Sequence, residues 1–98
     1  MSKFGELVTS DIPVLVHFFA QWNEACAEMN PILHDVAASL GDKLRIVKID
    51  VDKNKELIEA LRIKQVPTML LYKDNTMIWR QSKVMDVNSL INVVQTLL

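Results

Sequence analysis

Two side chains in the first third of the sequence are of types that could do chemistry together. Cys26 is the only cysteine of the chain, and His17 precedes it. A thiol acts as a nucleophile in its thiolate form, and a neighbouring imidazole could accept the thiol proton. One cysteine cannot form a disulfide within the chain or supply the four ligands of a structural zinc site. We therefore expect single-thiol chemistry at most, with no metal and no cofactor.

A buried strand and a long helix position Cys26. Residues 14–20 form a continuous apolar run rich in β-branched and aromatic residues, which is typical of a strand covered on both faces. After a two-residue break, Asn23 stands where a helix N-cap would stand, and apolar residues then recur at helical spacing. The pattern predicts a helix over 24–40 whose first turn contains Cys26.

The rest of the chain supplies further strands and helices. Apolar patterns predict a second buried strand over 44–51, strands over 69–73 and 76–81, helices over 55–61 and 87–97, and one or two helical turns within 2–11. A β-helix-β opening implies a parallel pair with a right-handed crossover, and Asp74-Asn75 is a hairpin signal that adds an antiparallel strand. The prediction is an α/β fold, a central mixed four-stranded sheet flanked by helices on both faces, built as a single domain over 1–98.

Composition argues against two classes of partner. The net charge is −1 with no basic block, so we expect no nucleic-acid partner. No apolar run is long enough to span a bilayer, so we expect no membrane partner. The first residues lack the apolar core of a signal peptide, which favours a cytoplasmic location.

The segment Trp22-Asn23-Glu24-Ala25-Cys26 resembles the active-site segment of the thioredoxin family. In that family a strand ends in Trp-Cys-Gly-Pro-Cys and runs into a long helix. This chain has the second cysteine and an asparagine in place of the first. The resemblance covers nearly the whole chain after residue 12 and implies a thioredoxin fold whose N-terminal strand is short or absent here.

A second, local resemblance is to the thioredoxin-like domain of multidomain monothiol glutaredoxins. The shared residues are His17-Phe18-Phe19-Ala20, Trp22, Cys26 and Met29-Asn30. Other segments, such as Val66-Pro67-Thr68, look more like a free-standing bacterial thioredoxin.

The thioredoxin resemblance implies particular roles for the two candidate residues. Cys26 matches the resolving thiol, which has nothing to resolve without its partner. His17 falls where the family commonly has a buried aspartate, and Lys48 matches the lysine usually found near it. Two cations would not share an apolar core, so we expect a neutral imidazole. We favour an unreactive, buried Cys26 and a hydrogen-bonded core His17 over a reactive thiol activated by the imidazole.

The resemblance also implies a binding surface. Val66-Pro67-Thr68 matches the family's loop with a cis proline, whose preceding backbone pairs with an extended substrate. Trp22 and Pro67 would border that surface, and Asn23 is counted among its binding residues. Lys83 falls where the family usually has a glycine, so the substrate range is expected to differ.

Two main hypotheses of function follow. The first is a thioredoxin-like protein that is not a dithiol oxidoreductase and acts in redox homeostasis as an adaptor. Its partners would be proteins or extended peptide segments bound at Trp22, Asn23, Val66, Pro67, Thr68 and Lys83. The alternative is a single-thiol redox protein that uses Cys26, helped by His17 and glutathione. We expect a monomer, and a dimer linked through Cys26 by a disulfide or a metal is a third possibility.

Overall fold

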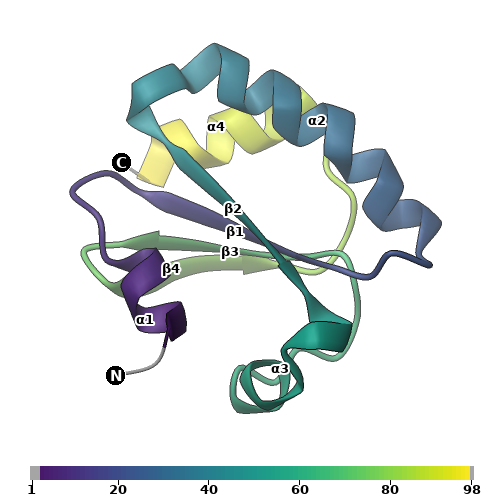
Figure 1. Cartoon of the computed structure of the whole chain (residues 1–98). Coiled ribbons are helices and arrows are strands. Elements are labelled where there is room, and N and C mark those ends of the chain that lie inside the picture. Colours follow the sequence, from purple (N-terminus) through teal and green to yellow (C-terminus); the bar gives the residue numbers. More distant parts are fainter. Residues whose placement is uncertain (1–2, 98) are drawn as a thin grey trace.

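The structure, a computed structural model, describes residues 3–97 (Figure 1). Its strands are β1 (Val14–Phe19), β2 (Arg45–Asp50), β3 (Thr68–Lys73) and β4 (Thr76–Gln81). Its α-helices are α1 (Lys3–Val8), α2 (Glu24–Leu40), α3 (Lys55–Ala60) and α4 (Val87–Leu97), and two 3-10 helices are η1 (Gly41–Lys43) and η2 (Val51–Lys53). All the predicted strands and helices are present, with ends that differ by one residue at most. The helical turns expected within 2–11 are α1, and residue 2 lies outside the described residues.

The four strands form one mixed sheet in the order β2-β1-β3-β4. β1 runs parallel to β2, and β3 is antiparallel to both β1 and β4. The two central strands, β1 and β3, are the two most apolar and the most buried, because each is paired on both sides and covered on both faces. Within the described residues α1, rather than a strand, precedes β1.

Helices cover both faces of the sheet, which confirms the predicted α/β architecture. In Figure 1, α2 and α4 lie together on one face, and α1 and α3 lie on the other. The α2/α4 face packs around a cluster that includes Leu15, Met29, Met69 and Leu90. The α1/α3 face packs around Phe18, Leu70 and Tyr72, and the ring of Phe4 lies against those of Phe18 and Tyr72. Both clusters include residues of β1 and β3, one cluster on each face of the sheet.

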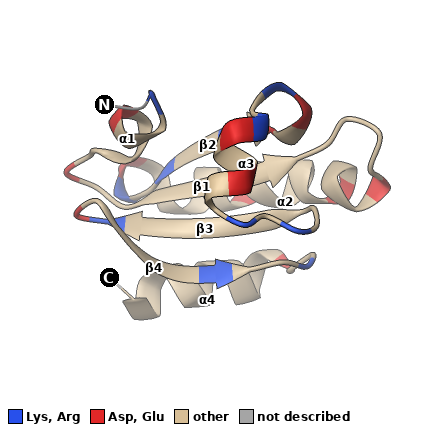
Figure 2. Ribbon diagram, turned by 90° about the horizontal axis from the view of Figure 1, so that it is seen from below, with Lys and Arg blue, Asp and Glu red and all other residues tan. Residues whose placement is uncertain are grey.

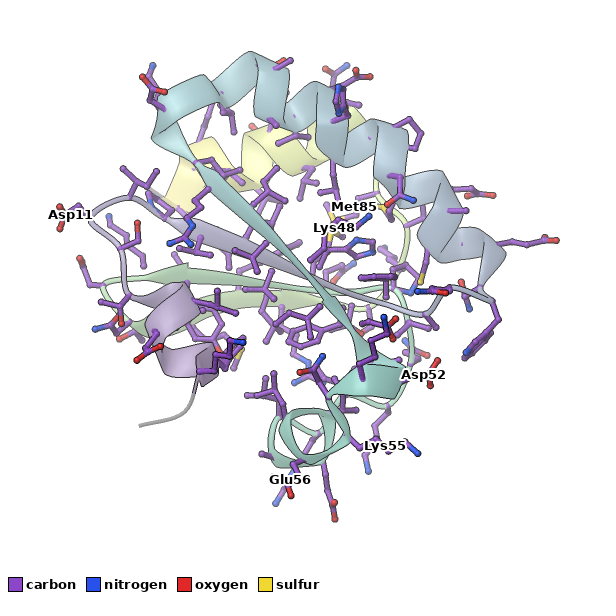
Figure 3. The ribbon with its side chains drawn as sticks, viewed as in Figure 1. Asp11, Lys48, Asp52, Lys55, Glu56 and Met85 are labelled. Carbon is purple, nitrogen blue, oxygen red and sulfur yellow. The ribbon has the colours of Figure 1, made fainter. Side chains whose placement is uncertain are left out.

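The prediction that the second strand is buried is wrong. β2 is an edge strand, paired only with β1, and its residues are mostly half-buried or exposed. Lys48 is exposed on the α2 side of this strand (Figure 3). Its Nζ donates a hydrogen bond to Asn30 Oδ1 at 2.8 Å and lies 4.9 Å from the centre of the Phe19 ring. A lysine on an edge strand can keep its charge in water, so the conflict expected between two buried cations does not arise.

Candidate functional site

Asn23 holds the N-terminus of α2. Its backbone is extended, with φ −99° and ψ 122°, and its Oδ1 accepts a hydrogen bond from the backbone N–H of Cys26 at 2.9 Å. A helix start presents unpaired N–H groups and a partial positive charge, and an asparagine N-cap stabilises a helix by about 1 kcal/mol. The side chain therefore caps the helix N-terminus, and its amide is not a nucleophile.

Trp22 stands out from the surface just before this cap. Its side chain is 71% exposed, and its Nε1 donates a hydrogen bond to Asp52 Oδ2 at 3.1 Å. Asp52 lies in η2, the turn that follows β2 (Figure 3). Gln21 makes a matching bond from Nε2 to Asp50 Oδ2 at 3.3 Å. These two bonds tie the loop after β1 to the end of β2 and orient an exposed indole ring.

The loop before β3 lies beside the α2 N-terminus. The Val66–Pro67 peptide bond is cis, and both Pro67 and Thr68 are buried. Thr68 Oγ1 donates to Gln65 O at 2.6 Å and lies 2.9 Å from Ser82 Oγ. The backbone N–H and C=O of Val66 have no hydrogen-bond partner among the described residues. Val66 thus has one backbone donor and one acceptor that no described residue satisfies.

A pocket of about 370 Å³ brings these elements together; we call it the Trp22 pocket. It is lined by Trp22, Asn23, Val51, Ile58, Ile63, Lys64, Gln65 and Val66.

Of the residues predicted to bind, the Trp22 pocket includes Trp22, Asn23 and Val66. Pro67 and Thr68 are buried behind it, and Lys83 is exposed in the loop after β4. Sequence reasoning missed the lining residues from η2, α3 and the loop after α3. The spacing of apolar residues predicts that Ile58 lies on the apolar face of a helix. Only the fold shows that this face borders the same pocket as Trp22.

Cys26 does not line the Trp22 pocket. It is 3% exposed and borders a separate, smaller cleft that it shares with Phe19, Ala20 and Asn30, among others. Burial raises the pKa of the Cys26 thiol, while a hydrogen bond with the backbone of Ala20 and the charge of Lys48 act in the opposite direction. A buried thiol with a raised pKa holds little thiolate at neutral pH. This arrangement favours an unreactive Cys26.

His17 is fully buried on the α2 face of β1, and it differs from the hydrogen-bonded histidine that we expected. Neither Nδ1 nor Nε2 has a hydrogen-bond partner among the described residues. Burial lowers the pKa of His17 to about 4, and the charge of Lys48, its neighbour on β2, acts in the same direction. The imidazole is therefore neutral at neutral pH, as predicted. Its nearest ring neighbour is Phe19, 5.9 Å away between ring centres.

The Thioredoxin family model matches residues 1–96 of the chain. The chain belongs to the thioredoxin family. Relatives include Thioredoxin Y of Oryza sativa subsp. japonica, named chloroplastic, which is 37% identical over 98 residues, and a thioredoxin-like protein of Synechocystis sp., 35% identical over 95 residues. The match covers 99% of this chain and 58% of the rice protein, and 96% of this chain and 90% of the Synechocystis protein. Against Thioredoxin Y1 of Arabidopsis thaliana the covered share of the relative is 40%.

Solved thioredoxin structures share the fold. A thioredoxin from Halobacterium salinarum NRC-1 superposes with a TM-score of 0.88 at 24% identity, covering 98% of this chain and 83% of that one. Chloroplastic thioredoxin z superposes with a TM-score of 0.86 at 26% identity, covering 98% and 89% of the two chains. This family member therefore keeps the fold and has a single cysteine, Cys26.

A first prediction concerns the remaining thiol. We expect native Cys26 to react with iodoacetamide at pH 7 at least roughly tenfold more slowly than the same thiol in the unfolded chain, because burial both hides the sulfur and lowers its thiolate fraction. Mass spectrometry of samples quenched over time gives both rates, with the chain in urea as the reference. Native alkylation as fast as in urea would show a reactive Cys26.

Proposed function

We propose that this thioredoxin-family chain binds extended segments of other proteins in the Trp22 pocket, as an adaptor in redox homeostasis, and does not carry out dithiol exchange. The observation that carries the proposal is the capped N-terminus of α2. Asn23 occupies the position of the family's nucleophile and hydrogen-bonds to Cys26 N, while the neighbouring indole, apolar pocket and open backbone of Val66 remain available for binding.

The physical basis of such binding is twofold. A segment that pairs with the N–H and C=O of Val66 gains main-chain hydrogen bonds that do not depend on its sequence. An apolar side chain placed among Trp22, Val51, Ile58 and Ile63 leaves water, which adds about 25 cal/mol for each Å² of apolar surface buried. Neither contribution needs a thiol.

The alternative function, single-thiol exchange at Cys26, has less support from the site. Exchange requires a thiolate that a disulfide can reach, and Cys26 is buried with a raised pKa. The unpartnered His17 remains neutral and could accept a proton, but Lys48 beside it disfavours the resulting imidazolium.

The proposal is tested with a probe that has no free thiols, the reduced and carboxamidomethylated B chain of insulin. Calorimetry should show saturable binding to the unmodified chain, and Trp22→Ala should weaken it about five- to tenfold because exposed aromatic anchors dominate small interfaces. His34→Ala, on an exposed face of α2, is the matched control and should bind as the unmodified chain does. Equal binding by the unmodified chain and Trp22→Ala would contradict the proposal, as would reduction of intact insulin by the unmodified chain.

Compartment and oligomeric state are part of the same proposal. None of the helices within residues 3–97 is long and apolar enough to cross a bilayer. We propose a cytoplasmic monomer; its plant relatives are named chloroplastic, and they are longer proteins. The burial of Cys26 disfavours a dimer linked through that residue.

A further inference from the structure

Two lysines flank the open backbone of Val66. Lys64 precedes it in the loop after α3 and lines the Trp22 pocket. Lys83 is held nearby, because Gln65 Nε2 donates to the carbonyl oxygen of the adjacent Ser82 at 2.9 Å. Figure 2 shows both loops, after α3 and after β4, at the same end of the sheet. Lys64 and Lys83 therefore lie on two loops that a hydrogen bond joins next to Val66.

These charges are uncommitted. Within residues 3–97, neither ammonium group has an ion-pair or hydrogen-bond partner, and both residues are exposed. Lysines without a carboxylate neighbour raise the local concentration of negatively charged groups and speed their approach. The guanidinium of Arg80, in contrast, donates hydrogen bonds to the carbonyl oxygens of Leu61 and Arg62.

Three acidic side chains lie on the side of the indole ring, and a fourth, Asp86, follows Lys83 in the loop after β4, where its carboxylate accepts hydrogen bonds from Ser89 N and Oγ. Asp52 accepts the Trp22 hydrogen bond and Asp50 accepts that of Gln21, so both carboxylates are held on η2 and the end of β2. Glu24 is exposed in the first turn of α2. Hydrogen-bonded carboxylates therefore lie on the Trp22 side and at Asp86, whereas Lys64 and Lys83 carry positive charge that no carboxylate within residues 3–97 pairs with. A bound segment gains most when its carboxylates lie toward the two lysines.

The Trp22 pocket is apolar at its base. Val51, Ile58 and Ile63 are half-buried or buried, and with Trp22 they enclose space for one large apolar side chain. Exposed ion pairs contribute little affinity by themselves, whereas an aromatic or aliphatic anchor in such a pocket contributes more. The anchor would supply affinity and the lysines selectivity.

We propose that the preferred partner segment of this site is acidic and apolar: an extended stretch with one large apolar side chain for the Trp22 pocket and carboxylates that reach Lys64 and Lys83. The inference rests on the proposed binding function and adds the chemistry of the partner. It assigns Lys64 and Lys83 as residues that determine specificity.

The test compares three ten-residue peptides without cysteine, each with a central leucine, whose flanking residues are all Glu, all Gln or all Lys. At low salt we expect the Glu peptide to bind about tenfold more tightly than the Gln peptide, and the Lys peptide to bind most weakly. At about 0.5 M NaCl the Glu and Gln peptides should differ by no more than about twofold, because salt screens exposed charges.

Matched variants identify the source of any preference. Lys64→Gln and Lys83→Gln should each weaken the Glu peptide about three- to fivefold and leave the Gln peptide unchanged. Lys43→Gln is the control; it removes an exposed lysine before β2, at the other end of the sheet from the Trp22 pocket, and should change neither peptide.

The results separate this inference from the function on which it rests. Equal binding of the Glu and Gln peptides at low salt, or a Glu preference that survives both lysine substitutions, overturns the acidic-apolar inference. If the insulin B-chain probe binds and none of the three peptides does, the inference fails while the proposed function stands. If neither the probe nor any peptide binds, the proposed function itself fails.

Discussion

The Asn23→Cys variant is expected to reduce insulin disulfides at least roughly tenfold faster than the unmodified chain, which should show no activity above the dithiothreitol background. The substitution places a thiol at the N-terminus of α2, where helix N–H groups favour the thiolate. The introduced thiolate attacks the substrate disulfide, forms a mixed disulfide and releases one substrate thiol. Cys26 then attacks the mixed disulfide, releases the second thiol, and leaves an internal disulfide for dithiothreitol to reduce.

Recovery should be partial. Burial raises the pKa of Cys26, so little of this thiol is thiolate when the second step begins, and Lys48 disfavours the imidazolium that His17 would become by accepting its proton. Loss of the Asn23 cap costs about 1 kcal/mol, which a small domain tolerates.

Two controls accompany the variant. Asn23→Ser keeps a good cap without a thiol and should be inactive. Asn23→Cys combined with Cys26→Ser should form a mixed disulfide and fail to turn over. If Asn23→Cys forms its internal disulfide and still reduces nothing, the surface around the Trp22 pocket no longer supports exchange, and the chain left redox chemistry by more than one substitution.

Acidification should destabilise the chain through His17. An unfolded histidine titrates at about 6.5, whereas the folded imidazole resists protonation down to about 4 because it is buried and faces Lys48. The unfolded state therefore binds the proton more readily. The stability conferred by the neutral His17 is complete above about pH 6.5 and falls as the pH drops toward 4. The gap between the two pKa values corresponds to a loss of about 3 kcal/mol.

Urea unfolding at pH values between 7.5 and 4 measures this loss, and His17→Leu is the matched variant. Leucine does not titrate and removes two buried nitrogens without partners, so the variant should lose about 3 kcal/mol less over the same range. His34 is exposed and present in both chains, so its contribution cancels. Parallel loss of stability in the two chains would show that His17 is not the acid-sensitive group.

The sequence was a good guide to the elements and to the cap of α2. The unbroken apolar run that became β1 and the cap at Asn23 are local signals that need no knowledge of their partners. The exposure of Lys48 was not predictable in this way. The apolar pattern of residues 44–51 predicts a buried strand even though it contains a lysine. Only the strand order shows that β2 is paired on one side.

The lining of the Trp22 pocket illustrates a second limit. Val51, Ile58 and Ile63 belong to η2, α3 and the loop that follows, which the chain brings against Trp22 from a distance in sequence. The separate cleft beside Cys26 was equally unpredictable from the sequence, because the cleft that a side chain of α2 borders depends on how α2 packs over β1. Periodicity indicates which side chains leave water, but it does not say which others they meet.

The central claim, that the chain binds a segment along Val66 without a nucleophile, is tested most directly by hydrogen exchange at the Val66 amide. NMR would follow that N–H in the unmodified chain, free and with the alkylated insulin B chain at a concentration that occupies about nine-tenths of it. Because a paired amide exchanges only from the free fraction, we predict exchange about tenfold slower in the complex. Unchanged exchange at Val66 under saturating probe would contradict the account.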